Sequence, residues 1–203
     1  MQNYLMLNGK KIELTNEQVK TLLGGSDKEQ VRLSDIPVGK TFKINEYEFI
    51  VLERSSGATA VLLKNLLHNS EKFGSNNNYD GSNADKLCCE FGDKIAEIVG
   101  ADNLIEHTVD LTADDGLKCY GSVKRKMSLL TAQQYREYVY IIDEHKLDKW
   151  WWLATAYSTA KHDDADWVKC VSPDGGISSI TYYDGSYGVR PFCILKSNIF
   201  VSL

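Results

Sequence analysis

The segment at residues 162–166 places an imidazole and three carboxylates within five positions. These side chains are His162, Asp163, Asp164 and Asp166. Carboxylate oxygens are ligands that Ca²⁺ prefers. However, the segment has no glycine for the tight turn of a calcium loop, and no E-P-N or Q-P-D ligand pattern occurs. We therefore predict a solvated acidic loop and no required cofactor, and we keep Asp163, Asp164 and Asp166 as the ligand set that Ca²⁺ would use.

The sequence also lacks common motifs of catalytic sites. The four histidines do not form the H-x-x-H or H-E-x-x-H pattern of a zinc site, and no G-x-S-x-G motif sets a serine on a nucleophile elbow. The five cysteines are odd in number, lack C-x-x-C spacing, and are predicted to be buried reduced thiols. They are Cys88, Cys89, Cys119, Cys170 and Cys193. We therefore predict a protein that is not an enzyme.

Aromatic residues near the C-terminal end of the sequence are the best candidates for contacting a ligand. Tyrosine and tryptophan dominate binding hot spots, and these residues lie in or next to predicted loops. The predicted ligand-binding residues are Trp150, Trp167, Tyr182, Tyr183, Asp184, Ser186 and Tyr187. His162 and Asp163 adjoin them and can supply further hydrogen bonds.

Three nearby residues are predicted to be structural. Trp151 and Trp152 follow each other in a predicted strand, so one of the two rings must face inward. Arg190 stands in the final strand beside aromatic residues, where a cation is costly to bury unless it is paired. We therefore expect Arg190 to form a salt bridge or to cap loop carbonyls.

Composition narrows the class of protein. The chain has 203 residues, of which 43% are hydrophobic and 25% charged, as expected for one globular domain or for one domain with a small appendage. The net charge of -5 argues against a nucleic-acid partner, because such binding depends on Lys and Arg. The sequence has neither an apolar run long enough for a membrane helix nor a secretion signal at its start, so we expect no membrane partner and a cytoplasmic or virion-associated protein.

Hydrophobic patterning divides the chain into residues 1–30 and 31–203. The first part is predicted to be a strand, with a turn at Asn8-Gly9, and then a helix from Thr15, followed by a linker. A unit this small has no core of its own. We expect it to pack on the main domain or on another copy of the chain.

The main domain is predicted to mix strands with two helices. Alternating apolar residues indicate a half-buried sheet with one strand through residues 42–51 and the next at 60–63, joined by the turn at 55–57. One helix is predicted from Ser82 or Asn83 to Gly100, and another from Thr131, where Gln134 completes a capping box. Strands are predicted at residues 107–111, 150–153, 168–171 and 177–182, with a final strand at residues 189–195.

The order of motifs resembles a family of uncharacterised domains common in gut Firmicutes and their phages and prophages. Those domains have a W-W-L-R-[ST] segment, a strand pair around a D-G turn and a terminal G-V-R-P. Here the corresponding residues are Trp151-Trp152-Leu153, Asp174-Gly175 and Gly188-Val189-Arg190-Pro191, and the resemblance covers roughly residues 31–196. Ala154 departs from the pattern because arginine is usual there, so no role of that arginine is carried over.

The Gly188–Pro191 ending is also similar to the G-F-R-P that closes the C-type-lectin-like fold. That fold occurs in formylglycine-generating-enzyme relatives and in the variable proteins of diversity-generating retroelements. The resemblance implies an α+β, C-type-lectin-like domain with antiparallel sheets, whose loops form an exposed binding surface.

Two functions of different classes follow from these patterns. The first is a non-catalytic phage- or prophage-type module that recognises a protein or glycan through the C-terminal aromatic loops. The alternative is a cytoplasmic inhibitor of a host anti-phage system that uses its acidic loops to occupy a basic groove.

Overall fold

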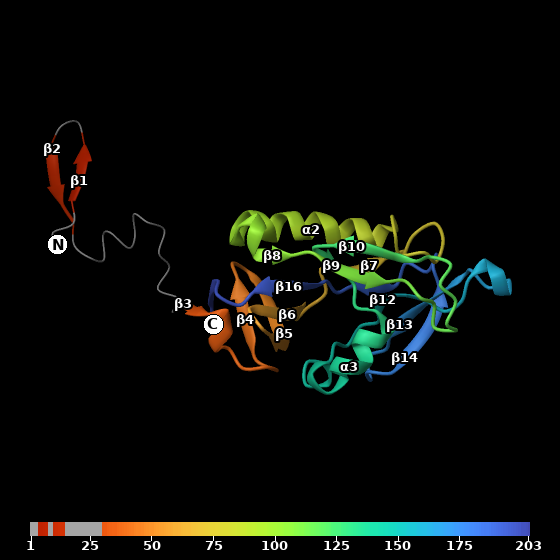
Figure 1. The fold of residues 1–203 in the computed structure, drawn as a ribbon. Helices are drawn as coiled ribbons and strands as arrows, with labels where there is room; N and C mark the ends of the chain where they lie inside the picture. Colours follow the sequence, from red (N-terminus) through yellow and green to blue (C-terminus); the bar gives the residue numbers. More distant parts are fainter. Residues whose placement is uncertain (1–3, 8–9, 15–29) are drawn as a thin grey trace.

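The computed structural model describes residues 4–7, 10–14 and 30–203, and these residues form a mixed α+β fold (Figure 1). The described residues contain two α-helices, α2 (Asn83–Val99) and α3 (Ala132–Asp143). Three short 3-10 helices are η1 (Leu33–Asp35), η2 (Ala101–Asn103) and η3 (Ala160–His162). The expectation of an α+β fold with two main helices is therefore confirmed.

The larger sheet has eight strands, and all its pairs are antiparallel. In spatial order its strands are β11 (Met127–Ser128), β16 (Phe192–Lys196), β6 (Ala58–Leu63), β5 (Tyr47–Ser55), β4 (Thr41–Ile44), β17 (Phe200–Ser202) and β3 (Gln30–Arg32). The short β8 (Leu104–Ile105) also pairs with β16.

The smaller sheet has five strands and carries the aromatic segments. In spatial order they are β14 (Ile177–Thr181), β13 (Trp167–Val171), β12 (Trp151–Ala156), β15 (Tyr187–Val189) and β7 (His68–Glu71). The β12–β15 pair is parallel and the other pairs are antiparallel. Two separate two-stranded sheets pair β9 (His107–Asp110) with β10 (Ser122–Arg125), and β1 (Tyr4–Leu7) with β2 (Lys10–Glu13).

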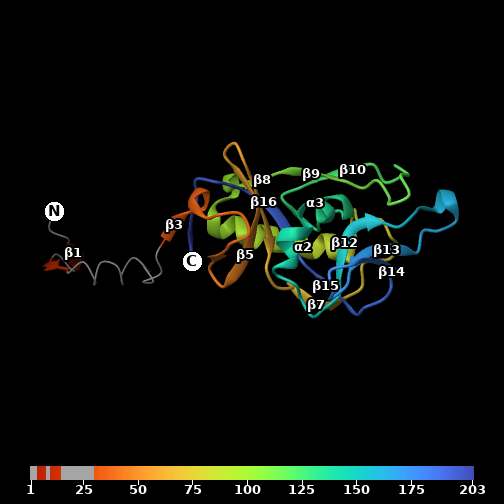
Figure 2. The ribbon, with the colours of Figure 1, turned by 90° about the horizontal axis from the view of Figure 1, so that it is seen from below.

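The two helices lie on opposite sides of the strands, and each covers its own hydrophobic core (Figures 1 and 2). Helix α2 contributes Phe91 and Ile95 to one core, and α3 contributes Tyr135 and Ile142 to the other. Strand β12 supplies alternate residues to both cores. Trp152 belongs to the α2 core and Trp151 to the α3 core, so both rings are buried.

Burial on both faces corrects the expectation of a half-buried sheet. Residues 49–52 of β5 and 59–63 of β6 are buried without interruption, because helices cover both sides and neither face needs polar residues. The single strand expected through residues 42–51 was also wrong. The chain turns between β4 and β5 at Asn45, whose φ of 53° lies in the left-handed region that asparagine tolerates.

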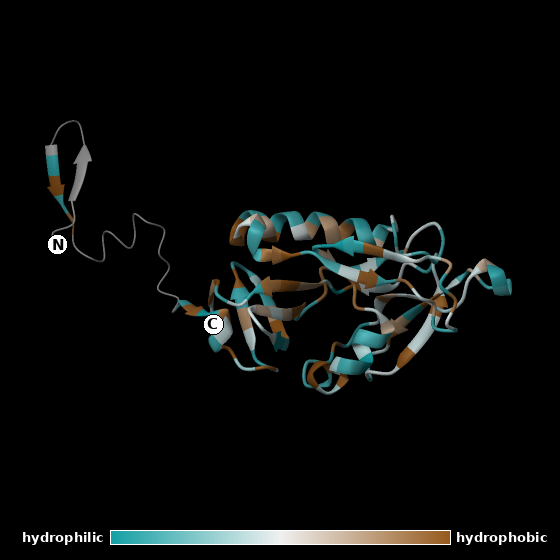
Figure 3. Cartoon of the chain, viewed as in Figure 1, coloured by the Kyte–Doolittle hydropathy of each residue, from teal (hydrophilic) through white to brown (hydrophobic). Residues whose placement is uncertain are grey.

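Both helices begin where the capping patterns predict. The Ser82 hydroxyl accepts from the Asp85 amide to start α2, and Gly100, with φ of 90°, ends this helix. Thr131 and Gln134 form the predicted capping box of α3. Figure 3 shows hydrophilic and hydrophobic residues alternating along α2, as expected for an amphipathic helix. In the last turn of α2, the apolar side chain of Ile98 is exposed.

The single final strand expected at residues 189–195 was also wrong, because two strands in different sheets share this range. Strand β15 ends at Val189 in the smaller sheet, and β16 begins at Phe192 in the larger one. Pro191 lies at the crossing, where it has no amide hydrogen to donate to a sheet, while its carbonyl accepts from the Leu63 amide.

The cysteine prediction was largely correct. All five cysteines are free, and Cys88, Cys170 and Cys193 are buried, whereas Cys119 is exposed. Burial raises the pKa of Cys170 to about 12, so its thiol stays protonated at neutral pH.

The N-terminal predictions lie partly outside the described residues. Strands β1 and β2 pair in antiparallel register, whereas the Asn8-Gly9 turn and the helix from Thr15 are not among the described residues. No helix in the described part of the chain has the length and apolar character needed to cross a bilayer.

Candidate functional site

One half of a face of the smaller sheet is left uncovered by α3. Strands β13 and β14 pair Trp167 with Thr181, Lys169 with Ser179 and Val171 with Ile177. Alternate residues of a strand share a face, so these three pairs lie on one side of the sheet. Val171 and Ile177 belong to the core that α3 covers. The other two pairs, Lys169 with Ser179 and Trp167 with Thr181, therefore lie beyond the part of this face that α3 buries.

A hollow of about 350 Å³ opens on this uncovered half. We call it the sheet hollow, and it is lined by Tyr157, Asp164, Trp167 and Ser179. The Tyr157 and Trp167 side chains are 44% and 40% exposed. The Tyr157 amide donates to the Trp167 carbonyl at 2.9 Å, which fixes the two residues next to each other.

A chain of charged residues lies behind Tyr157. The Lys169 ammonium is 5.5 Å from the centre of the Tyr157 ring and 3.2 Å from the Asp114 carboxylate. The Arg136 guanidinium donates to the same carboxylate at 2.9 Å. Burial raises the pKa of Asp114, but hydrogen bonds from Arg136 and Lys169 outweigh this effect, so the pKa is lowered overall. Asp114 is therefore ionised at neutral pH and shared by two cations.

The neighbouring carboxylate, Asp115, ties the loop before β13 to the β9–β10 loop. Ser158 donates to Asp115 at 2.5 Å, and Nδ1 of His162 lies 2.9 Å from the same oxygen. The Ser158 bond is the main reason that the pKa of Asp115 is lowered. A nucleophilic triad needs the histidine between the serine and the carboxylate. Here both residues bond to Asp115, which is the arrangement of a loop anchor.

The predicted ligand-binding residues do not form one surface. Trp167 lines the sheet hollow, whereas Tyr182 packs against the core on the α2 side of the same sheet. Tyr187 is only 9% exposed, and its ring lies 4.5 Å from that of Trp152 and 5.7 Å from that of Trp150. The structure therefore places Tyr187 in the core, where it contributes packing rather than an open contact surface.

Of the remaining predicted residues, Tyr183, Asp184 and Ser186 lie in the turn between β14 and β15, whereas Trp150 directly precedes β12. Tyr183 is exposed, and its ring packs edge-on against Tyr182 at 5.2 Å between centres. The Ser186 amide donates to the Asp184 carboxylate at 2.9 Å, which closes this turn on itself. The turn is a second exposed aromatic site, separate from the sheet hollow.

The acidic loop is exposed, as its composition predicts. Asp163 and Asp166 are exposed, Asp164 is half-buried, and only Asp164 of the three lines the sheet hollow. Across residues 4–7, 10–14 and 30–203, no three His, Cys, Asp or Glu side chains are placed to hold a metal ion together. The structure thus does not assemble Asp163, Asp164 and Asp166 into a calcium site.

Arg190 is fully buried at the crossing between the two sheets. Its guanidinium donates to the carbonyls of Leu63 and Lys64 at 2.9 Å and to that of His145 at 3.3 Å. It also lies 5.2 Å from the centre of the Trp151 ring. Burial lowers the pKa of Arg190 to about 10, so it remains charged at neutral pH. The cation thus binds carbonyls of β6 and of the segment after α3, and packs on the smaller sheet.

Sequence reasoning missed most residues of the sheet hollow and the charged chain behind it. Tyr157 lies just beyond the W-W-L segment and Ser179 lies within a predicted strand, so neither stood out in the sequence. Lys169 gave the clearest signal, because it interrupts an otherwise apolar strand, and such a residue needs a partner when buried. Asp114 and Arg136 come from distant segments, so their spacing in the sequence gave no signal.

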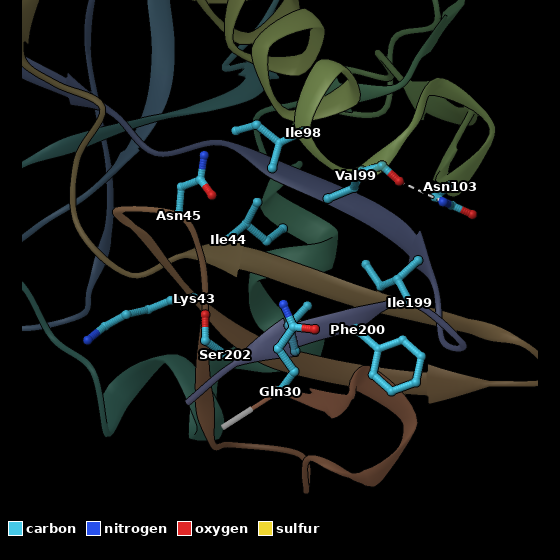
Figure 4. A pocket seen from close by; sticks show the side chains of 11 residues that line it. Gln30, Lys43, Ile44, Asn45, Ile98, Val99, Asn103, Ile199, Phe200 and Ser202 are labelled. Carbon is cyan, nitrogen blue, oxygen red and sulfur yellow. Dashed lines mark hydrogen bonds between the residues drawn. The ribbon is translucent and has the colours of Figure 1, made fainter. Parts of the chain in front are cut away.

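A second hollow, of about 480 Å³, lies between the last turn of α2, strand β4 and the C-terminal strand β17 (Figure 4). Its walls include the exposed Ile98 and Phe200, and Gln30 at the start of β3. Its remaining lining consists of Lys43, Ile44, Asn45, Val99, Asn103, Ile199, Val201 and Ser202. The lining thus combines aliphatic side chains with three amides and the Lys43 ammonium.

Comparison with known protein families gives a match over part of the chain. Residues 106–197 match the model of a domain of unknown function (DUF6273). The matched range contains all four residues of the sheet hollow and the Lys169–Asp114–Arg136 chain. No curated protein and no solved structure matches the chain. The similarity is thus to an uncharacterised domain over the part of the chain that forms the candidate site.

Proposed function

We propose that this protein is a non-catalytic recognition module and that the sheet hollow is its binding surface. The observation that carries the proposal is the pair of exposed rings, Tyr157 and Trp167, beside the polar side chains of Asp164 and Ser179. Burial of large aromatic side chains against a ligand lowers the free energy of the complex. A few polar groups then fix the orientation of the ligand. Volumes of a few hundred Å³ are typical of such sites.

The resemblance to C-type-lectin-like domains agrees with this proposal. In that fold the last strand and a tryptophan segment pack at the core, and neighbouring loops present the binding surface. Here Trp151 pairs with Gly188 between β12 and β15, and the loop between β12 and β13 borders the sheet hollow. Free thiols at all five cysteines are what a reducing compartment favours, which supports the proposal of a cytoplasmic or virion-associated protein.

Ligand selection with matched variants tests the proposal. The purified full-length chain is screened against a glycan array and a displayed random-peptide library. Trp167→Ala should lose the selected ligands, since it removes one wall of the sheet hollow. Tyr140→Ala should keep them, because Tyr140 is an 87% exposed aromatic residue on α3 outside the lining of the hollow. Thermal melting of each variant confirms that it is folded.

The turn that carries Tyr183 is the competing surface. Tyr183→Ala should retain the ligands if the sheet hollow binds them. Ligands that are lost in Tyr183→Ala and kept in Trp167→Ala would refute the assignment and move the site to that turn.

A further inference from the structure

The charge around the sheet hollow is negative. The loop between β12 and β13 carries Asp163, Asp164 and Asp166 against Lys161. Behind the hollow, the lysine and arginine of the charged chain bind Asp114, and the adjoining Asp115 bonds to Ser158 and His162. Among the Asp, Lys and Arg side chains of this set, carboxylates outnumber cations five to three. A ligand that brings positive charge is therefore favoured at the hollow.

Asp164 is the carboxylate placed to meet such a ligand. It lines the sheet hollow, and no described residue pairs with its carboxylate. Lys169, the cation of the charged chain that packs against Tyr157, is only 8% exposed and already binds Asp114. A carboxylate beside an open hollow can form strong charge-assisted hydrogen bonds with an incoming N–H donor.

The exposed rings favour the same kind of ligand. The face of an aromatic ring attracts cations, and tryptophan does so most strongly. The protein already uses this attraction at Tyr157, whose ring lies 5.5 Å from the Lys169 ammonium. Trp167, across the hollow, has no cation placed over it among the described residues.

We propose that the sheet hollow receives the side chain of an arginine or lysine from a basic segment of a partner protein. The cation packs on Trp167 and donates to Asp164, while Ser179 and Tyr157 complete the walls. This inference rests on the proposed function, because it assigns a ligand class to the same hollow. It selects a protein partner over a neutral glycan on the ground of charge complementarity.

The test uses three fluorescein-labelled peptides of the form (Gly-X)₃-Gly, in which X is arginine, lysine or neutral citrulline. Binding to the full-length chain is measured by fluorescence polarisation at 50 and 300 mM salt. The arginine and lysine peptides should bind, and the citrulline peptide should bind about three- to thirtyfold more weakly. Higher salt should weaken binding of the charged peptides and bring them closer to citrulline.

Two variants and two controls place the interaction. Trp167→Ala and Asp164→Asn should each weaken arginine-peptide binding about three- to thirtyfold. Tyr140→Ala is the aromatic control. Asp102→Asn is the acidic control, because Asp102 is exposed and lies just before the segment that forms β8. Figure 1 places β8 at the opposite end of the domain from β13. Both controls should bind as the unaltered protein does.

The outcomes separate this inference from the proposed function. Equal binding of the citrulline and arginine peptides, or no binding of either charged peptide at millimolar concentration, would overturn the inference about charge. In that case, glycans or peptides selected in the screen and lost in Trp167→Ala would still sustain the hollow as a binding site. If no ligand distinguishes Trp167→Ala from Tyr140→Ala, the site itself is wrong.

Discussion

Replacement of Arg190 by methionine should destabilise the protein by about 3 kcal/mol. Methionine has similar length but no donor, so the carbonyls of Leu63, Lys64 and His145 lose their partner. An unsatisfied buried acceptor costs about 1–3 kcal/mol, which gives about 6 kcal/mol for the three. Against this, burial lowers the pKa of Arg190 from 12.5 to about 10, so removal of the charge recovers about 3 kcal/mol.

Lysine at the same position separates geometry from charge. Arg190→Lys keeps the buried charge, but a single ammonium cannot reproduce the forked donors that reach three carbonyls. We therefore expect it to be no more stable than Arg190→Met, although lysine is the more conservative change in charge.

Urea unfolding followed by circular dichroism measures both variants. A loss of about 3 kcal/mol corresponds to a melting temperature lower by about 6–12 °C in a chain of this size. The control is Arg136→Met, where an exposed ion pair with Asp114 should contribute less than about 1 kcal/mol. Stability of Arg190→Lys within 1 kcal/mol of the unaltered protein would refute the reasoning, because charge alone would then suffice.

Three further predictions concern other buried groups. Asp85→Ala should cost about 1.5–3 kcal/mol in urea unfolding, since it removes the buried carboxylate to which Arg125 donates at 2.7–2.8 Å, while Arg125 keeps its ion pair with Asp80; a loss below 1 kcal/mol would contradict this. Gly188→Ala should cost about 1–3 kcal/mol, because a Cβ there would lie 2.9 Å from the backbone carbonyl oxygen of His68 and would also overlap the Leu66 side chain; an unchanged melting temperature would show that this segment shifts without cost. Burial lowers the pKa of His107 below 6.5, so the folded state binds fewer protons than the unfolded state, and the free energy of unfolding should fall as pH drops from 6.5 toward the folded pKa. His107→Gln should reduce this pH dependence between pH 7.5 and 5, and an unchanged pH profile in the variant would exclude His107 as its source.

Local patterns predicted the helices well, because their start signals are contained in a few neighbouring residues. Ser82 and Thr131 accept hydrogen bonds from amides three positions later, so the sequence alone holds the information. The sheets were harder, because the burial of a strand depends on what covers it. Trp151 and Trp152 point to opposite faces as alternation requires, yet both are buried because each face has its own helix-covered core.

The residues of the candidate site are brought together by the register of paired strands, so their spacing along the sequence could not predict the site. Lys169 and Ser179 meet through the pairing of β13 with β14, while Asp114 reaches Lys169 from the loop between β9 and β10. The expected aromatic cluster failed for a related reason. Neighbouring loops in the sequence can emerge on different faces of one sheet, and Trp167 and Tyr182 do so. Only Trp167, of the seven predicted ligand-binding residues, lines the sheet hollow.

The distribution of the four tryptophans makes the protein its own optical reporter. Trp151 and Trp152 are enclosed in two different cores, whereas Trp150 and Trp167 are partly open to water. A soluble quencher such as acrylamide should therefore divide the emission into an accessible and a protected population. A ligand in the sheet hollow shields Trp167 and moves its share of the emission to the protected population. Unfolding of the α2 core exposes Trp152, and unfolding of the α3 core exposes Trp151. Binding and unfolding can thus be followed separately in one unlabelled sample.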